Sequence, residues 1–288
     1  GEISKRFEPV LQRVEPDAVL VVGDVNSTLA CSLVSSYHHI PVIHVEAGLR
    51  SFDRTMPEEI NRVLTDRISE LLFATEPSAL KNLKNEGIDT SRVYLVGNVM
   101  IDTLFRTRQI AQEQSDILQR LQLQSGAYAV MTLHRPSNVD SVAPFRSILE
   151  AISQLAKEIP VIFPVHPHTQ KRIEEFQLTH LMSRIKAILP IPYLDMLCLM
   201  SSAKLVLTDS GGMQEETTAL EIPCITLRDN TERPLTLEEG TNVLSGNEKQ
   251  NILKHTTDLL TNRSKKGKRP HLWDGKAAER IMTILNNW

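Results

Sequence analysis

Short runs of aliphatic and β-branched residues alternate along the chain with longer stretches in which apolar positions recur every three or four residues. This rhythm is typical of β–α–β units that build a parallel sheet. Nearly all of the apolar runs are continuous, which predicts strands buried on both faces between layers of helices. We therefore expect an α/β fold with doubly wound sheets. The predicted strands are residues 19–22, 42–45, 71–74, 93–96, 129–133, 161–165, 185–189, 205–208, 224–227 and 242–244.

The length of 288 residues fits two α/β domains of roughly 150 residues each. A long polar helix is predicted from Met100 to about Leu123, between the two sets of strands, so we place the domain boundary near residue 105. A basic stretch at residues 262–270 reads as a solvated surface loop, and a last helix is predicted from Gly275 to Asn287.

Composition and charge narrow the class of protein. The chain is 41% hydrophobic and 23% charged, as in ordinary globular proteins, and 32 basic against 35 acidic residues give a net charge of −3. This balance disfavours nucleic acid as a partner and favours a small molecule. We expect neither a transmembrane segment nor a signal peptide. The three separated cysteines, Cys31, Cys198 and Cys224, indicate buried thiols in a reducing cytoplasm rather than disulfides or a zinc site.

Unusually polar residues follow the predicted strands, at the sheet edge where α/β proteins bind ligands. They supply carboxylates and imidazoles suited to general acid–base chemistry. If the two domains face each other, these side chains share one crevice. They are Asp24 and Asn26 after the first strand, Glu46 and Arg50 after the second, and His134, His166, His168 and Asp209 after later ones.

The segment from Asp209 to Glu216 predicts a strand end, a turn of small residues and a helix start. Free backbone amides at such a helix start, here at Ser210, Gly211 and Gly212, can hold a diphosphate. A simple capped turn is the equally good structural interpretation. Glu216 lies one turn into the helix, where its carboxylate suits a ribose diol, and together these features suggest a nucleotide.

The segment 52–62 predicts a loop that leads into a helix with Pro57 at its start and Glu58 in its first turn. Acids in a first turn ordinarily complement the helix dipole, but the same position would keep Glu58 ionised and ready to act as a base. His44 lies near Glu46, where a role in orienting that carboxylate is one interpretation. His134, His168 and Asp209 fit either supporting or structural roles.

Several cofactor motifs are missing from the sequence. It has no Gly-x-Gly-x-x-Gly after a strand, no Gly-x4-Gly-Lys-Ser/Thr, and no His-Glu-x-x-His or cluster of cysteines and histidines. We therefore expect chemistry without a metal and without a cofactor.

A set of motifs in register resembles the non-hydrolysing UDP-N-acetylglucosamine 2-epimerases, from about residue 10 to the end. The motifs are GDVNST, HVEAGLRS, PEEINR, GNVMID, LHRP, PVHP, TDSGGMQEE and RDNTERP. The resemblance implies two Rossmann-like domains of glycosyltransferase-B type, which face each other across a cleft that binds the UDP-sugar. It also implies that a C-terminal helix returns to the N-terminal domain, so that residues 1–105 with 271–288 form one domain and 106–270 the UDP-binding domain.

The resembling enzymes interconvert UDP-GlcNAc and UDP-ManNAc by eliminating UDP across carbons 1 and 2 and adding it back, for polysaccharide synthesis. By motif, the resemblance assigns acid–base roles to Asp24, Glu46 and Glu58 and places His166 near the leaving diphosphate. The UDP site would comprise Ser210, Gly211, Gly212, Glu216 and Arg233, with Ile191 and Met196 around the base. Arg233 suits this role because a guanidinium stabilises the departing phosphate. A homodimer is also implied.

Three departures from the family pattern bear on this reading. The usual N-terminal strand and Gly-Thr-Arg-Pro-Glu turn have no match, so we expect an N-terminal domain that lacks several βα units. Ile191 and Met196 replace the usual Gln and Phe, and Ser137 replaces an acidic residue beside a regulatory UDP-GlcNAc site. The alternatives are a UDP-sugar glycosyltransferase of the same fold, an epimerase for a modified substrate such as a diacetamido uronate, and an inactive UDP-sugar-binding remnant.

Overall fold

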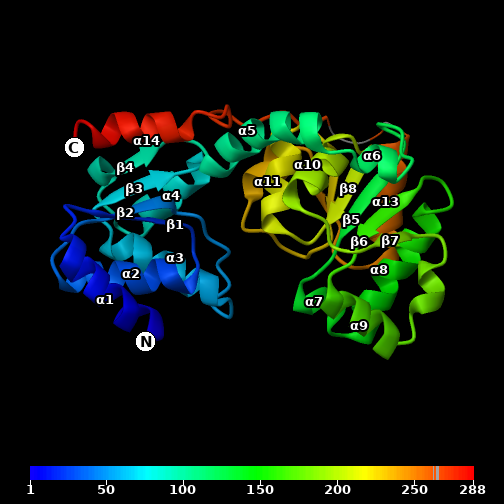
Figure 1. Ribbon diagram of the computed structural model, residues 1–288, viewed down its shortest axis with the longest axis horizontal. Helices are drawn as coiled ribbons and strands as arrows, with labels where there is room; N and C mark the ends of the chain where they lie inside the picture. The colour runs from blue at the N-terminus through cyan, green and yellow to red at the C-terminus, as the bar shows by residue number, and fades with distance from the viewer. Residues whose placement is uncertain (262, 264–265) are drawn as a thin grey trace. The chain divides into compact units, whose positions relative to one another are not determined.

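The computed structural model describes residues 1–261, 263 and 266–288. Contacts between Cα atoms divide the chain into two compact units, which are described separately below. Unit 1 comprises Gly1–Asp102 together with His271–Trp288, and unit 2 comprises Thr103–Pro270. Each unit is built around a parallel sheet with helices against it (Figure 1), so the expected α/β class is confirmed.

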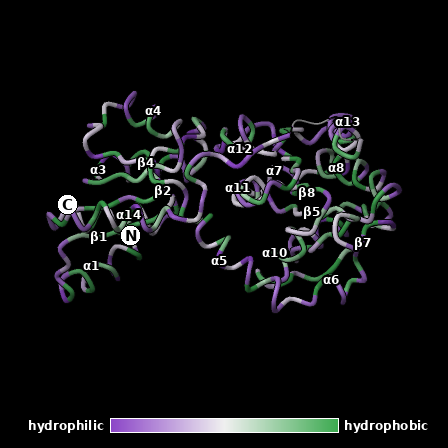
Figure 2. Tube along the Cα trace, turned by 90° about the horizontal axis from the view of Figure 1, so that it is seen from above, coloured by the Kyte–Doolittle hydropathy of each residue, from purple (hydrophilic) through white to green (hydrophobic). Residues whose placement is uncertain are grey.

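Unit 1 contains a four-stranded parallel sheet in the order β1-β2-β3-β4. Pro57 and Pro77 each occupy the first position of a helix, where a missing amide hydrogen costs nothing. The elements are α1 (Glu2–Val14), β1 (Val19–Val22), α2 (Asn26–Tyr37), β2 (Val42–Ala47), α3 (Pro57–Ile68), β3 (Leu71–Ala74), α4 (Pro77–Asn85), η1 (Thr90–Arg92), β4 (Val93–Leu95), the start of α5 (Val99–Gln114) and α14 (Ala277–Leu285). Hydrophobic and hydrophilic residues alternate along outer helices such as α1 (Figure 2).

Alternate residues of the unit 1 strands face different helices. Ile43, Val45 and Phe73 pack with Ile281 of α14, whereas Leu72 packs with side chains from the α4 region. The carboxylate of Asp102 accepts hydrogen bonds from the amides of Ala277 and Ala278 at the start of α14, at 3.1 and 2.7 Å. The C-terminal helix is thereby tied to unit 1.

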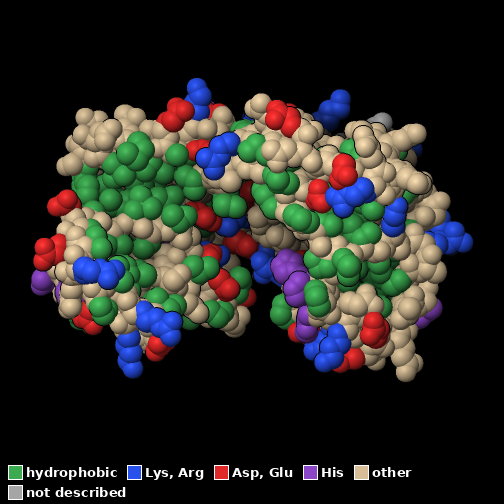
Figure 3. Space-filling view, in the orientation of Figure 1, with side chains coloured by type: hydrophobic (Ala, Val, Ile, Leu, Met, Phe, Trp, Pro, Cys, Tyr) green, Lys and Arg blue, Asp and Glu red, His purple; other side chains and the backbone are tan. Residues whose placement is uncertain are grey.

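The expectation of burial on both faces is wrong for β1. Leu20 and Val22 retain 47% and 46% exposure, although Val21 between them is buried. They pair in register with Ile43 and Val45, so they lie on the face that α14 covers farther along the sheet. Hydrophobic side chains gather over this part of unit 1 (Figure 3). Leu20 and Val22 stay exposed because β1 is the edge strand of the sheet, which the covering helix α14 does not reach.

Unit 2 contains a six-stranded parallel sheet in the order β10-β9-β8-β5-β6-β7. Its elements are the remainder of α5, α6 (Ile117–Arg120), β5 (Ala129–Thr132), α7 (Pro136–Val139), α8 (Val142–Leu155), β6 (Val161–Pro164), α9 (Pro167–Glu175), η2 (Thr179–Met182), β7 (Lys186–Ile188), α10 (Tyr193–Ser201), β8 (Leu205–Thr208), α11 (Gly211–Ala219), β9 (Cys224–Thr226), α12 (Pro234–Glu238), β10 (Asn242–Leu244) and α13 (Lys249–Leu260). Met131, Phe163 and Leu207 pack with α8 and α13 into the largest hydrophobic cluster of the unit.

Each predicted strand forms, and its ends agree with the prediction to within two residues. The single helix predicted from Met100 to Leu123 is wrong, because α5 ends at Gln114 and α6 begins at Ile117. The hydroxyl of Ser115 accepts a hydrogen bond from the Ile117 amide and donates one to Asp195, so it starts a new helix at the break. The last helix is shorter than predicted, at Ala277–Leu285. The predicted basic loop includes residues 262, 264 and 265, which lie outside the described residues.

Candidate functional site

The end of β2 presents Glu46 on an irregular backbone. The pairing of β2 with β3 shifts register between Val45 and Ala47, and Glu46 at this bulge has a φ of 72°. A side chain other than glycine in this left-handed region is strained, and such strain is concentrated at functional sites. A carboxylate oxygen of Glu46 lies 3.7 Å from the position that a Cβ on Gly23 would occupy. The bulge therefore aims Glu46 at the turn that carries Asp24.

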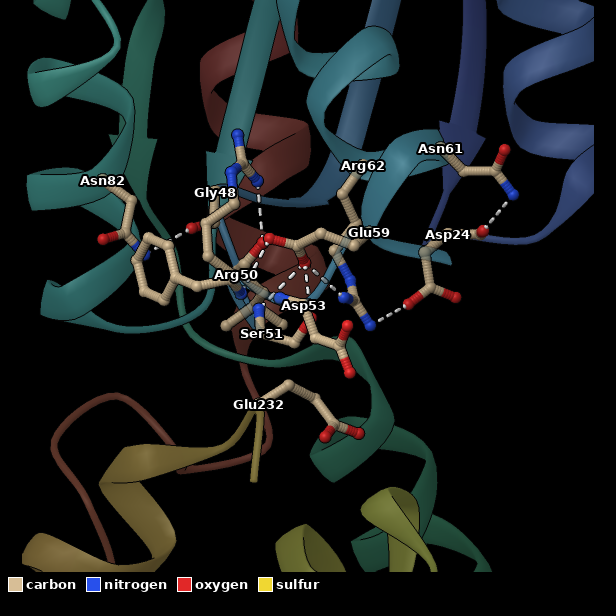
Figure 4. A network of polar contacts seen from close by, with 12 residues as sticks. Asp24, Gly48, Arg50, Ser51, Asp53, Glu59, Asn61, Arg62, Asn82 and Glu232 are labelled. Carbon is tan, nitrogen blue, oxygen red and sulfur yellow. Dashed lines mark hydrogen bonds and ion pairs between the residues drawn. The ribbon is translucent and has the colours of Figure 1, made fainter. Parts of the chain in front are cut away.

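Asp24 follows β1 and is held by α3. Arg62 Nη2 lies 2.6 Å from Asp24 Oδ2, and Asn61 Nδ2 donates to the Asp24 carbonyl at 2.8 Å. Arg62 Nη1 also donates to Glu59 Oε2 at 2.9 Å (Figure 4). One forked guanidinium thus joins two carboxylates, an arrangement for which Arg is better suited than Lys. Asp24 and Glu46 lie on either side of the same turn within unit 1.

The two glutamates at the start of α3 have different environments. Glu59 is buried and accepts hydrogen bonds from the Ser51 amide at 2.8 Å, the Ser51 hydroxyl at 3.0 Å and the Phe52 amide at 3.0 Å. Burial by itself raises the pKa of Glu59, but these donors and Arg62 lower it below its ordinary value. Glu59 therefore fixes the loop that precedes α3.

Glu58 is exposed and precedes Arg62 by four residues, so both lie on the same face of α3. Because Arg62 binds Asp24, this geometry places Glu58 on the side of α3 nearest to Asp24. His44, in contrast, makes its hydrogen bonds to Asp66 and to the Gly23 carbonyl.

In unit 2, Asp209 organises the ends of β5 and β8. It is completely buried and accepts hydrogen bonds from the amides of His134 and Arg135 and from Asn138 Nδ2. The Nδ1 atom of His134 lies 2.9 Å from Asp209 Oδ1. Burial alone raises the pKa of Asp209, but the contacts with His134 and the backbone amides lower it below its ordinary value. Asp209 and His134 therefore support the loop beside the start of α11.

The predicted anion site lies at the start of α11. Ser210 is the N-cap, and Gly211 and Gly212 form the first turn, so their amide groups have no partner within the helix. A Cβ on Gly211 would lie 2.8 Å from an oxygen of Glu232, which shows that this carboxylate sits against the helix start. Sequence reasoning missed Glu232, because nothing in the local pattern brings this loop to α11.

A cluster of arginines surrounds Glu232. Arg228 Nη2 lies 2.8 Å from one carboxylate oxygen, and Arg135 Nη2 lies 3.5 Å from the other. Burial alone raises the pKa of Glu232, but Arg228 and Arg233 lower it to about 2. Arg233 is the N-cap of α12, and its Nε lies 3.1 Å from Glu215 Oε1 on α11. The RDNTERP motif thus brings three charged side chains, Arg228, Glu232 and Arg233, to one buried network.

Glu216 faces Tyr193 across the start of α10. The Tyr193 hydroxyl donates to Glu216 Oε1 at 2.7 Å, and burial raises the pKa of Glu216, an effect that this hydrogen bond partly offsets. Met196 lies one turn beyond Tyr193 on α10, and Ile191 lies in the loop that precedes this helix; both are partly buried. These residues therefore form one neighbourhood at the carboxyl end of the unit 2 sheet.

His166 lies at the carboxyl end of β6, as the N-cap of α9. It is exposed, and its Nδ1 accepts a weak hydrogen bond of 3.3 Å from the His168 amide. His168 instead pairs with Asp140 at 2.8 Å on the surface. All the strands of this sheet are parallel, so His166 emerges at the same edge as Ser210 and Arg228.

Within the described part of the chain, no group of three or more His, Cys, Asp or Glu side chains could hold a metal ion. None of the described helices is long and apolar enough to cross a membrane.

Comparison with known proteins identifies the family. A family model described as UDP-N-acetylglucosamine 2-epimerase matches residues 1–286. The chain is 44% identical over 292 aligned residues to the UDP-N-acetylglucosamine 2-epimerase of Methanocaldococcus jannaschii, covering 99% of this chain and 79% of that protein. It is 40% identical over 249 residues to the UDP-2,3-diacetamido-2,3-dideoxy-D-glucuronate 2-epimerase of Pseudomonas aeruginosa, covering 85% of this chain and 68% of that protein.

Solved structures agree with this result. The M. jannaschii enzyme in complex with UDP-GlcNAc and UDP superposes with a TM-score of 0.89 at 44% identity, covering 100% of this chain and 80% of that one. The Neisseria meningitidis UDP-GlcNAc 2-epimerase bound to UDP-GlcNAc gives a TM-score of 0.89 at 33% identity, covering 99% of this chain and 80% of that one. The chain described here therefore belongs to the UDP-N-acetylglucosamine 2-epimerase family.

Proposed function

We propose that this protein interconverts UDP-GlcNAc and UDP-ManNAc by eliminating UDP across carbons 1 and 2 of the sugar and adding it back. The observation that carries the proposal is that Glu46, at the end of β2, is aimed at the turn after β1 that carries Asp24, in a chain of this family. Such a reaction moves protons at carbon 2 and needs carboxylates or other acid–base groups at the sugar. It needs no redox cofactor, because the hydroxyl-bearing carbons are not oxidised.

Within unit 1, the proposal gives the acid–base roles to Asp24, Glu46 and Glu58. Arg62 supports it, because its guanidinium, 2.6 Å from Asp24 Oδ2, holds that carboxylate in one orientation. Glu59 takes no part in proton transfer in this scheme, since its oxygens are occupied by donors from the 51–52 loop. Elimination leaves a 2-acetamidoglucal, which the same carboxylates reprotonate from the other face.

For unit 2 we propose the UDP-binding role, with unit 1 as the sugar-binding domain. The diphosphate would lie on Ser210, Gly211 and Gly212, with His166 and Arg233 near the phosphate that leaves. Glu216 would accept hydrogen bonds from the ribose hydroxyls. The base would pack beside Ile191 and Met196. The helix dipole of α11 and the arginines around its start support anion binding here.

The test is hydrogen exchange during turnover. UDP-GlcNAc incubated with the protein in deuterium oxide should gain deuterium at carbon 2 while UDP-ManNAc forms, as read by NMR and mass spectrometry. Asp24→Asn should abolish both, whereas Asp17→Asn, which changes an exposed carboxylate before β1, serves as the matched control. Acceptor-dependent release of UDP without deuterium uptake would instead identify a glycosyltransferase. Binding of UDP without turnover would identify a binding protein.

A second substrate is favoured by one observation. The relative from P. aeruginosa is named for a diacetamido-glucuronate substrate and is 40% identical over the aligned region. A panel of UDP-GlcNAc and this diacetamido uronate, compared by kcat/KM for deuterium uptake, separates the two assignments. We expect the larger value for UDP-GlcNAc.

We also propose a homodimer in the cytoplasm, acting in surface polysaccharide synthesis. An apolar groove of about 440 Å³ on unit 1 supports self-association, because its lining includes the exposed side chains Phe52, Ile60, Val63 and Leu64. The three free cysteines, two of them buried, suit a reducing compartment. Sedimentation of the wild type and of Leu64→Glu tests the dimer; the variant should sediment as a monomer.

A further inference from the structure

A completely buried histidine lies beside the carboxylates of unit 1. His44 projects from β2, has no exposed side-chain surface, and makes two hydrogen bonds through its ring. Its Nδ1 lies 2.6 Å from Asp66 Oδ1, and its Nε2 lies 2.9 Å from the carbonyl oxygen of Gly23. A carbonyl oxygen can only accept a hydrogen bond, so Nε2 must carry a hydrogen.

The contacts of Asp66 bear on whether Nδ1 of His44 also carries a hydrogen. Asp66 Oδ2 accepts a hydrogen bond from the Gly48 amide at 3.1 Å and lies 2.7 Å from Arg50 Nη2. Arg50 pairs with Asp66 Oδ2, so the other carboxylate oxygen, Oδ1, is left as an acceptor for the His44 ring. Both ring nitrogens of His44 therefore face acceptor oxygens, an arrangement that favours the doubly protonated imidazolium.

The Gly23 carbonyl links this imidazolium to the candidate acid–base group. The carbonyl of Gly23 and the amide of Asp24 belong to the same planar peptide, so fixing one fixes the other. Gly23 itself has a φ of 72°, a left-handed conformation that glycine adopts freely. Because glycine adopts other conformations as freely, the turn needs an outside contact to stay in this one.

We propose that His44 is a positioning residue that acts as a buried imidazolium and holds the Gly23–Asp24 peptide through its hydrogen bond to the Gly23 carbonyl, so that deprotonation of His44 switches the site off at high pH. The proposal rests on the proposed function for the role of Asp24. It does not require His44 to touch the substrate. Asp66 and the Gly23 carbonyl occupy both of its nitrogens.

The direction of the pH dependence follows from the surroundings. Burial by itself lowers the pKa of His44, but the hydrogen bond and charge of Asp66, the Gly23 carbonyl and Glu46 raise it above its ordinary value. The protonated state therefore persists to a higher pH than in an ordinary histidine and is lost as pH rises through the raised pKa. The charged groups that face this cluster are Asp66 on α3, Glu46 on β2, Arg50 after β2, Glu86 after α4, and Asp24 and its partner Arg62.

The first arm of the test is NMR on the wild-type protein, which does not depend on turnover. The ¹⁵N spectrum should show both His44 nitrogens protonated at pH 7.5, and the Asp24 backbone amide should shift with the same apparent pKa as the ring. A singly protonated ring would overturn the proposal, and so would an Asp24 amide whose chemical shift does not change as His44 titrates. This arm stands even when the enzymatic activity differs from the one proposed.

The second arm compares kinetics of His44→Gln, which keeps hydrogen bonding without a charge, with His38→Gln, a matched change at a half-exposed surface pair in unit 1. We expect kcat to fall about 10-fold or more in His44→Gln with KM within about twofold, and the alkaline decline of kcat to disappear. His38→Gln should match the wild type. An alkaline decline that is unchanged in His44→Gln would contradict the role of His44. Absence of turnover by the wild type would count against the proposed function, and the NMR arm would then decide the inference.

Discussion

Arg62 is the residue that connects the sequence motif PEEINR with the carboxylate after β1. Its single guanidinium binds Asp24 at 2.6 Å and Glu59 at 2.9 Å. The motif suggested acid–base glutamates. The local pattern could not show which residue binds Asp24, because that contact joins residues that lie 38 positions apart in the chain. Pairings of this kind depend on the tertiary fold.

Replacing Arg62 by Lys should impair catalysis more than binding. A Lys ammonium cannot bridge two carboxylates with a rigid fork, so Asp24 loses its fixed orientation. We expect kcat for epimerisation to fall by about 10- to 100-fold, with KM changed by about twofold or less. Steady-state kinetics with UDP-GlcNAc measure both, and Arg6→Lys, in an exposed pair on α1, is the control. An equal rise in KM with constant kcat would argue for a role in binding.

Asp66 should be among the residues of unit 1 whose replacement costs the most stability. It has no exposed surface and holds His44, Arg50 and the Gly48 amide. Asp66→Asn leaves two buried cationic groups without their common anion, which should lower the free energy of unfolding by about 3–5 kcal/mol. Urea denaturation followed by tryptophan fluorescence and circular dichroism measures the change.

The matched control for this change is Glu2→Gln, which removes an exposed ion pair with Arg6 on α1. Exposed pairs contribute little, so the denaturation midpoint should hardly move. Equal effects of the two substitutions would show that the buried cluster is not a stabilising one.

At the scale of elements, the strands were predictable because each is a short run of aliphatic residues, and every one of those runs forms a strand. The β2 bulge at Glu46 was not predictable from the sequence, because a register shift depends on the partner strand β3. The break between α5 and α6 depends on Ser115 and its contact with the distant Asp195. Composition likewise could not show that β1 is left partly uncovered.

The start of α11 carries a testable competition between an internal carboxylate and a diphosphate. Glu232 lies against Gly211, at the positive end of the helix, and remains ionised across the ordinary pH range because its pKa is held at about 2. Glu232→Gln should tighten UDP binding by about 3- to 10-fold, since the amide competes less for the arginines. Isothermal titration calorimetry with UDP measures this.

A suitable control for that experiment is Glu239→Gln, which lies just after α12 in an exposed pair with Lys268. Its affinity for UDP should equal that of the wild type. Weaker binding by Glu232→Gln would mean instead that Glu232 orders Arg228 and Arg135 for the ligand.

At the scale of the whole molecule, the chain forms unit 1 from two separate segments and unit 2 from one continuous segment. A chain that ends after Pro270 keeps all of the strands but loses α14, whose Ile281 packs on Ile43, Val45 and Phe73. We expect amide hydrogens of β5 to β10 to keep their protection from exchange and those of β1 to β4 to lose most of it. Hydrogen exchange mass spectrometry reads both sets in one experiment, and equal protection of β1 to β4 with and without α14 would contradict this expectation.

The attachment of α14 to Asp102 has a consequence for the order of events during synthesis. Residues 103–270 leave the ribosome as one uninterrupted stretch ahead of α14, so unit 2 has every one of its segments before unit 1 does. Unit 1 begins to emerge before unit 2, yet the face of its sheet that packs on Ile281 lacks its helix until α14 follows and reaches the carboxylate of Asp102. The unit that begins to emerge earlier is therefore the unit that finishes folding later.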